Sequence, residues 1–180
     1  MESWYRAGRV RVALAVFVAT GALCGLAQER SGLEWKPATD TELRSVIPAR
    51  APVVQERIET EMRSASGITN GHGKYIAGVV LITAGYSAEG KYSHFLLTQV
   101  PLKLGADVRL APGDYLLGYT HGEKGLLIHI YEAASGKAVG TVTAALIPGI
   151  TRVEEIRIWP PGDRRIIQIG RFGFGYQIGG

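Results

Sequence analysis

Hydrophobic and β-branched residues recur in short runs about every ten residues from Tyr75 to the end of the chain. Glycine, proline and aspartate separate the runs, which is typical of an antiparallel sandwich or barrel. The 24 glycines fit this interpretation, because tight turns accept glycine and helices are destabilised by it. The runs are 75–85, 91–99, 113–121, 125–132, 138–146, 152–159, 165–170 and 171–178. We therefore predict an all-β fold, either an antiparallel β-sandwich or a partly closed barrel of about eight strands.

Three turns between these runs can be predicted from their residue types. Pro112-Gly113 opens a strand, and residues 134–137 form a hairpin loop with Gly136 in the left-handed conformation. The sequence Pro-Pro-Gly-Asp at 160–163 ends a strand, because proline cannot donate a hydrogen bond to a neighbouring strand.

Residues 53–66 carry two patterns at once. Pro52 and Gly67 are good start and stop residues for a helix, and opposite charges four residues apart support that interpretation. Alternating polar and apolar residues support a strand, with Glu56 as the one break in the pattern. We favour the strand, because Asn70-Gly71 follows it and Asn-Gly is a strong hairpin signal.

The first 27 residues have the order of parts of a secretory signal peptide. Arg6, Arg9 and Arg11 form a basic region, and an apolar run that is short for a membrane span extends from there to Ala27. Cleavage after Ala27 leaves a protein that is exported, periplasmic or extracellular, with no transmembrane segment. It also removes three arginines and Glu2, which lowers the net charge from +4 to +2 and gives no electrostatic argument for a nucleic-acid partner.

The single cysteine, Cys24, lies within this leader. The mature domain therefore has no thiol and must be stabilised by its core, even in an oxidising compartment. Two alternatives to cleavage stay open. Cys24 could carry a lipid, although the bulky Leu23 before it departs from the lipoprotein pattern, or the leader could remain as an anchor helix.

The mature chain divides into an adapter, 28–50, and a single β-rich domain, 51–180. In the adapter the apolar residues Trp35 and Leu43 are isolated among polar ones. Thr39 and Glu42 have the spacing of a capping box, which predicts one or two turns of helix in an otherwise extended segment.

Two short segments resemble a known family. Leu-Ala-Pro-Gly-Asp-Tyr-Leu-Leu at 110–117 is similar to a strand entry of transthyretin-like and carboxypeptidase-regulatory-like domains. Tyr-Glu-Ala-Ala-Ser-Gly-Lys at 131–137 is similar to one of their hairpins, with departures at Glu132 and Ser135. Together the segments cover under a tenth of the chain. The resemblance implies an extracellular β-sandwich that binds or scaffolds, and it assigns no functional residue.

The candidate chemical groups do not form a familiar motif. His121 and His129 flank a predicted tight turn, but strand alternation points the two rings to opposite faces, so we expect no metal and no cofactor. Ser93 and His94 are neighbours, and neighbouring strand side chains diverge, as do Glu154 and Glu155. Together with the absence of a Gly-x-Ser-x-Gly motif, this argues against a catalytic site.

The most regular stretch is 171–178, where four apolar side chains alternate with polar residues or glycine. They are Phe172, Phe174, Tyr176 and Ile178. They predict a half-buried final strand or, alternatively, a strip that lines a ligand cavity. As ligand-binding residues we nominate Trp159, Arg171, Tyr119 and His121.

We expect a non-catalytic exported domain that binds a partner protein or a small ligand at the cell envelope through loops on a rigid sheet. The alternatives are a small outer-membrane β-barrel, a hydrolase, and a carrier of an apolar ligand. The carrier requires a cavity lined by Tyr115, Leu117, Tyr119, Phe172 and Phe174. A cluster of His94, His121 and a glutamate would favour the enzyme.

Overall fold

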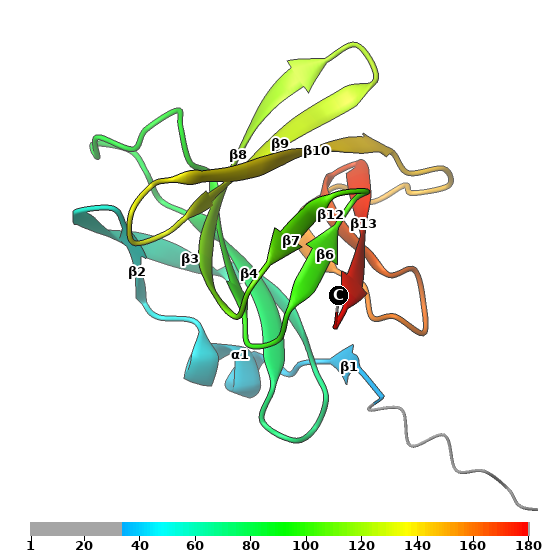
Figure 1. Cartoon of the computed structure of the whole chain (residues 1–180). Coiled ribbons are helices and arrows are strands. Elements are labelled where there is room, and N and C mark those ends of the chain that lie inside the picture. The colour runs from blue at the N-terminus through cyan, green and yellow to red at the C-terminus, as the bar shows by residue number, and fades with distance from the viewer. Residues whose placement is uncertain (1–33, 180) are drawn as a thin grey trace, which may run out of the picture. The chain divides into compact units, whose positions relative to one another are not determined.

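The computed structural model describes residues 34–179 (Figure 1). The predicted leader 1–27, with Cys24 and its cleavage site, and the first residues of the adapter lie outside this range. Within it there are thirteen strands and one short helix, so the all-β prediction is confirmed and the predicted number of strands is too low. The elements are β1 (Lys36–Pro37), α1 (Asp40–Val46), β2 (Arg50–Val53), β3 (Glu56–Thr69), β4 (Tyr75–Leu81), β5 (His94–Thr98), β6 (Leu102–Leu104), β7 (Val108–Leu110), β8 (Gly113–Gly122), β9 (Gly125–Glu132), β10 (Ala138–Leu146), β11 (Glu154–Ile158), β12 (Ile166–Gly170) and β13 (Phe172–Ile178).

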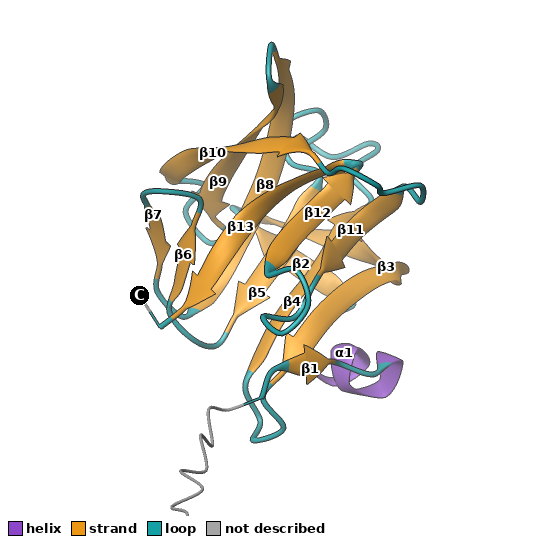
Figure 2. Ribbon diagram, turned by 90° about the vertical axis from the view of Figure 1, so that its right-hand side faces the viewer, coloured by secondary structure: helices purple, strands orange, loops and turns teal. Residues whose placement is uncertain are grey.

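The strands form one antiparallel sheet that curls strongly into a half-barrel (Figure 2). The strand order is β1-β3-β4-β5-β8-β9-β10-β13-β12-β11. Off this path, β2 pairs with β3, and the β6–β7 ribbon pairs with β13 through β6. The sequence missed β6 and β7 because three residues are too few to show a period.

In the ambiguous segment 53–66, Val53 ends β2 and residues 56–66 form the start and middle of β3, so the strand interpretation is confirmed. Residues 54 and 55 make a two-residue turn from β2, and Glu56 begins the strand, so the break in alternation at Glu56 marks the turn. The predicted hairpin with β4 is present, with a longer loop than Asn-Gly alone requires. In it Asn70 Oδ1 accepts hydrogen bonds from the backbone N–H groups of His72 and Lys74, at 2.9 and 3.1 Å.

The predicted helix in the adapter is α1. Its N-cap, Thr39, accepts a hydrogen bond from the N–H of Glu42, and the Glu42 carboxylate accepts one from the N–H of Thr39 at 2.8 Å, which completes the capping box. Leu43 on this helix is buried in a cluster that covers the outer face of the sheet. The helix therefore packs as a cover for β3 and β4.

The central strands are buried on both faces. On the inner face, residues of most strands form the main core, including Ile76, Leu96 and Leu117. On the outer face, Ala77 and Phe95 pack beneath α1, β2 and the 82–93 connection in a second cluster. This double burial explains why β4 and β5 are nearly continuous apolar runs in the sequence.

The last strand of the order, β11, lies against β3 and β4 without a backbone ladder to either. We call this contact the seam. Ile156 packs on Gly78 of β4, where an added Cβ would lie 2.5 Å from the Ile156 Cδ1 atom. Ser66 Oγ accepts a hydrogen bond from the N–H of Ile158 at 3.0 Å. The seam is thus closed by a few side chains.

We predict that Gly78→Ala destabilises the domain by about 1–3 kcal/mol, because the new methyl group overlaps a buried side chain. Ile156→Val removes the methyl group that would overlap the new Cβ, and by itself it lowers the free energy of unfolding by about 1 kcal/mol. The double variant should therefore lose less stability than the sum of the two, as measured by urea unfolding.

The matched control is Gly175→Ala in β13, where nothing lies within 4 Å of the added Cβ. This variant should unfold within about 0.5 kcal/mol of the native chain. Additive losses in the Gly78 and Ile156 cycle would show that the two residues do not interact across the seam.

Candidate functional site

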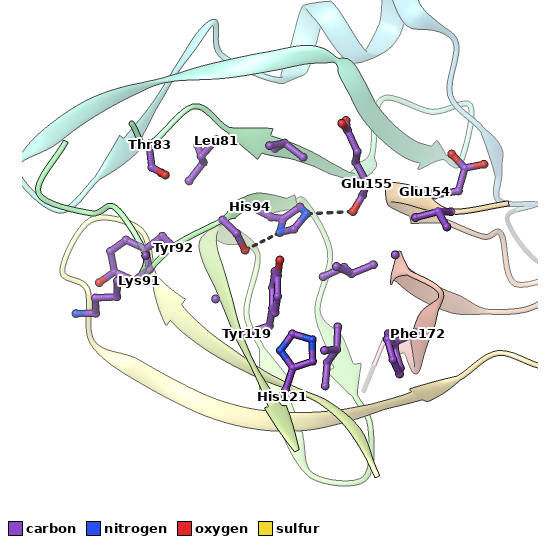
Figure 3. A pocket seen from close by; sticks show the side chains of 18 residues that line it. Leu81, Thr83, Lys91, Tyr92, His94, Tyr119, His121, Glu154, Glu155 and Phe172 are labelled. Atoms are coloured by element: carbon purple, nitrogen blue, oxygen red, sulfur yellow. Dashed lines mark hydrogen bonds between the residues drawn. The ribbon is translucent and has the colours of Figure 1, made fainter. Parts of the chain in front are cut away.

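A pocket of about 660 Å³ opens beside the seam (Figure 3). We call it the seam pocket. The ends of β4, β5, β8 and β9 and the end of the 82–93 connection form one side of it, and the start of β11 and the β12–β13 turn form the other. The walls include Leu126, Ile169 and Phe172, so the greater part of the lining is apolar.

A glycine in β8 brings the 82–93 connection to the pocket. A Cβ on Gly118 would overlap the backbone carbonyl oxygen of Lys91, so only glycine allows this close approach. Two residues later, the N–H of Ser93 donates to the carbonyl of Leu117 at 2.8 Å. These two contacts fix Ser93 at the wall of the pocket, immediately before β5 begins at His94.

His94 is the buried polar group of the pocket, with 4% of its surface exposed. Its Nε2 atom lies 3.1 Å from the carbonyl oxygen of Glu155, and its Nδ1 atom lies 2.8 Å from Ser93 Oγ. A carbonyl only accepts, so Nε2 carries the ring proton and Nδ1 accepts from the serine hydroxyl. Burial lowers the pKa of His94 to about 4, against a smaller opposing effect of the Glu155 hydrogen bond. The ring is therefore neutral near pH 7.

The sequence-based expectation that Ser93 and His94 diverge is wrong. Strand alternation applies only within a strand, and Ser93 precedes β5. Its backbone still bonds to Leu117 and Leu81 on the two flanking strands, and its hydroxyl lies within hydrogen-bond distance of the neighbouring ring. The residue types alone carried no signal for this, because the strand boundary cannot be located to one residue from sequence.

Tyr119 and His121, two of the four nominated residues, lie together in the seam pocket. Register pairs Tyr119 with Ile128 and His121 with Leu126, so the Tyr119 and His121 side chains share one face of the hairpin. Tyr119 is 43% exposed, and its ring centroid lies 6.3 Å from that of His121 and 6.4 Å from that of His94. His129 lies on the opposite face, hydrogen-bonded to two threonines.

The other two nominated residues lie elsewhere. Trp159 follows β11 and lines a second, more polar groove of about 590 Å³ across that strand from the seam pocket. Its Nε1–H donates to Gln168 at 2.9 Å, and the Arg157 guanidinium lies 3.9 Å from its ring centre. Arg171 is exposed in the turn between β12 and β13 and lines neither pocket.

Of the five residues named for a carrier, three belong to the packed core and two to the pocket. Tyr115, Leu117 and Phe174 are buried in the core, while Tyr119 and Phe172 line the seam pocket.

His94, His121, Glu154 and Glu155 gather in the same pocket, which is the cluster that we associated with an enzyme. Glu154 is paired with Arg152 at 3.1 Å and Arg157 at 3.3 Å. Glu155 is exposed at the mouth of the pocket.

Residues 34–179 hold neither a cluster of metal ligands nor a helix that could span a membrane. In this part of the chain, no group of three or more histidine, cysteine, aspartate or glutamate side chains is arranged to hold a metal ion. None of its helices has the length and apolarity to cross a membrane.

The burial of neutral His94 predicts a dependence of stability on pH. Between pH 6.5 and pH 4 only the unfolded chain takes up this proton, so the free energy of unfolding should fall by about 3 kcal/mol as the pH decreases. Above pH 6.5 the ring is neutral in both states and contributes no slope. His94→Gln removes this titration, so urea unfolding at pH 7, 6, 5 and 4 should give a shallower decline. If the free energy of unfolding declined equally with pH in the native chain and in His94→Gln, this would contradict the low pKa of His94 in the folded state.

Comparison of the sequence with protein-family models and with curated proteins, and of the fold with solved structures, finds no match. The resemblance of residues 110–117 and 131–137 to transthyretin-like domains therefore stays a prediction, although Gly136 does take the left-handed conformation expected for that hairpin (φ 68°). The geometry of the seam pocket carries the functional argument that follows.

Proposed function

We propose that this domain binds a small ligand with a largely apolar body in the seam pocket, as an exported protein of the cell envelope. The observation that supports this most directly is the size of the pocket, about 660 Å³. Small-molecule sites have volumes of roughly 300–1,000 Å³, with mostly apolar walls and a few polar groups that orient the ligand. The seam pocket has this composition.

The lining residues indicate which part of a ligand would lie where. Leu126, Ile169 and Phe172 offer apolar surface for the body of the ligand. Tyr119 and His121 offer aromatic rings with polar atoms at the same wall, and neither side chain hydrogen-bonds to another group within residues 34–179. A ligand with an aromatic or acyl body and one or two polar atoms fits this arrangement best.

The frame around the pocket favours binding without rearrangement. Most lining residues belong to strands or directly adjoin them, and the neighbouring strands β4, β5 and β8 are held by continuous ladders. Such a site is formed before the ligand arrives, which reduces the entropy lost on binding. The export of the protein rests on the leader sequence, which predicts delivery to the envelope.

We predict saturable binding of the neutral fluorescent probe N-phenyl-1-naphthylamine by the full chain. Tyr119→Ala should weaken this binding about tenfold, since it removes an aromatic wall from the pocket. Fluorescence titration measures the dissociation constant, and circular dichroism verifies that the variant is folded.

Leu127→Ala is the matched control. Leu127 lies on the same hairpin, is 36% exposed, and faces away from the seam pocket. It should bind the probe with the affinity of the native chain. Equal loss of affinity in both variants, or an absence of saturable binding by the native chain, would overturn the proposal.

A further inference from the structure

We propose that the seam pocket also hydrolyses esters, with the Ser93 hydroxyl as nucleophile and the His94 imidazole as its general base. This inference rests on the proposed function, because the ester would occupy the same pocket. Three groups form a hydrogen-bonded chain: Ser93 Oγ lies 2.8 Å from His94 Nδ1, and His94 Nε2 lies 3.1 Å from the Glu155 carbonyl oxygen. A nucleophile bonded to a base, with the base oriented by a third group, is the arrangement that activates a serine.

The direction of the hydrogen bonds suits this role. Nε2 donates to the Glu155 carbonyl, so the lone pair on Nδ1 faces the serine. The serine proton has a second acceptor, the Leu117 carbonyl oxygen at 3.1 Å, but only the imidazole can keep a proton. Ser93 is half-buried at the pocket wall, so a bound ester can reach its oxygen.

The reaction proceeds in two balanced halves. Ser93 Oγ attacks the ester carbonyl carbon while its proton passes to His94 Nδ1, and the tetrahedral intermediate then expels the alcohol, which takes that proton. Water attacks the resulting acyl-serine, His94 Nδ1 receives a proton from it, and Ser93 leaves with this proton. The sum is ester plus water giving acid plus alcohol, with no other reactant.

Tyr119 is positioned to stabilise the oxyanion. Its ring stands beside that of His94, with 6.4 Å between centroids, and Figure 3 shows its hydroxyl directed toward that histidine. No protein hydrogen bond is recorded for this hydroxyl among the described residues, so its proton is available to a substrate oxygen. A donor in such a position stabilises the charge that develops in the transition state.

The chemistry of the base narrows the class of ester. Burial lowers the pKa of His94 to about 4, so the imidazole is a weak base that activates the serine hydroxyl only modestly. Such a pair suits leaving groups that depart with little assistance, namely phenols and thiols, and does not suit amides. The titratable side chains in the walls around the ring are Lys91, Tyr92, Tyr119, His121, Glu154 and Glu155.

The test measures hydrolysis of p-nitrophenyl esters, from acetate to octanoate, by the full chain between pH 3 and pH 8. Ser93→Ala and His94→Gln should each lower kcat at least 100-fold. Ser93→Cys keeps a nucleophile and should retain measurable turnover. Tyr119→Phe should lower kcat about tenfold or more with little change in KM. The acid limb of kcat/KM should lie below pH 5.

Ser87→Ala is the control for the serine variants, because Ser87 lies in the same connection and hydrogen-bonds Glu56 outside the pocket. It should keep full activity. A fluorophosphonate probe should label the native chain at Ser93, located by peptide mass spectrometry, and should not label Ser93→Ala.

Absence of both turnover and Ser93 labelling, in a chain that still binds N-phenyl-1-naphthylamine, would overturn this inference and leave the binding function in place. An acid limb near pH 7 would also overturn it, because the base would then be a different group. Failure of the native chain to bind the probe would instead overturn the proposed function.

Discussion

The structure depends on how its last strand is attached. A curled sheet that stops short of a closed ladder leaves an edge strand whose outer backbone groups have no neighbouring strand. In this domain β11 is bonded to β12 along one edge, and its other edge is held by side chains of β3 and β5 together with packing on β4. Gly78 accepts Ile156, Ser66 binds the backbone of Ile158, and His94 binds the backbone of Glu155.

This mode of closure also accounts for the pockets. Side chains join the strands at separate points, whereas a ladder would close the gap along its whole length. Space therefore remains on both sides of β11, as the seam pocket and as the polar groove near Trp159. The residues 153–155 line both spaces. The site is in this sense a consequence of incomplete closure.

His94 links the stability of the fold to the chemistry of the pocket. Its Nε2–H donates a hydrogen bond to the Glu155 carbonyl, which leaves Nδ1 as an acceptor for the Ser93 hydroxyl. The burial that keeps the ring neutral preserves this arrangement near neutral pH. A protonated ring would need an acceptor at Nδ1 as well, and the serine hydroxyl would have to reverse its role.

Local signals in the sequence were sufficient for much of the fold and for one half of the site. Strand alternation predicted that His121 and His129 lie on opposite faces, and capping chemistry predicted α1. The pocket itself needs β8 to meet the β11–β13 strands, which are distant in sequence, so of the five residues named for a carrier cavity only Tyr119 and Phe172 line it. Ser93 was misjudged because a hydrogen bond between the side chains of two neighbouring residues leaves no periodic signal in the sequence.

The position of the pocket follows from a mismatch of strand lengths. β8 has ten residues and extends beyond its neighbours across the half-barrel, since β11 and β12 have five each. The inward face of β8 is therefore covered at Leu117, which has no exposed surface, and open at Tyr119, which is 43% exposed. On this one face of β8, the side chain of Leu117 is packed in the core, and that of Tyr119, two residues later, is accessible to a ligand. A pattern of this kind predicts which side chains share a face, while the length of the opposing strands decides which of them remain available to a ligand.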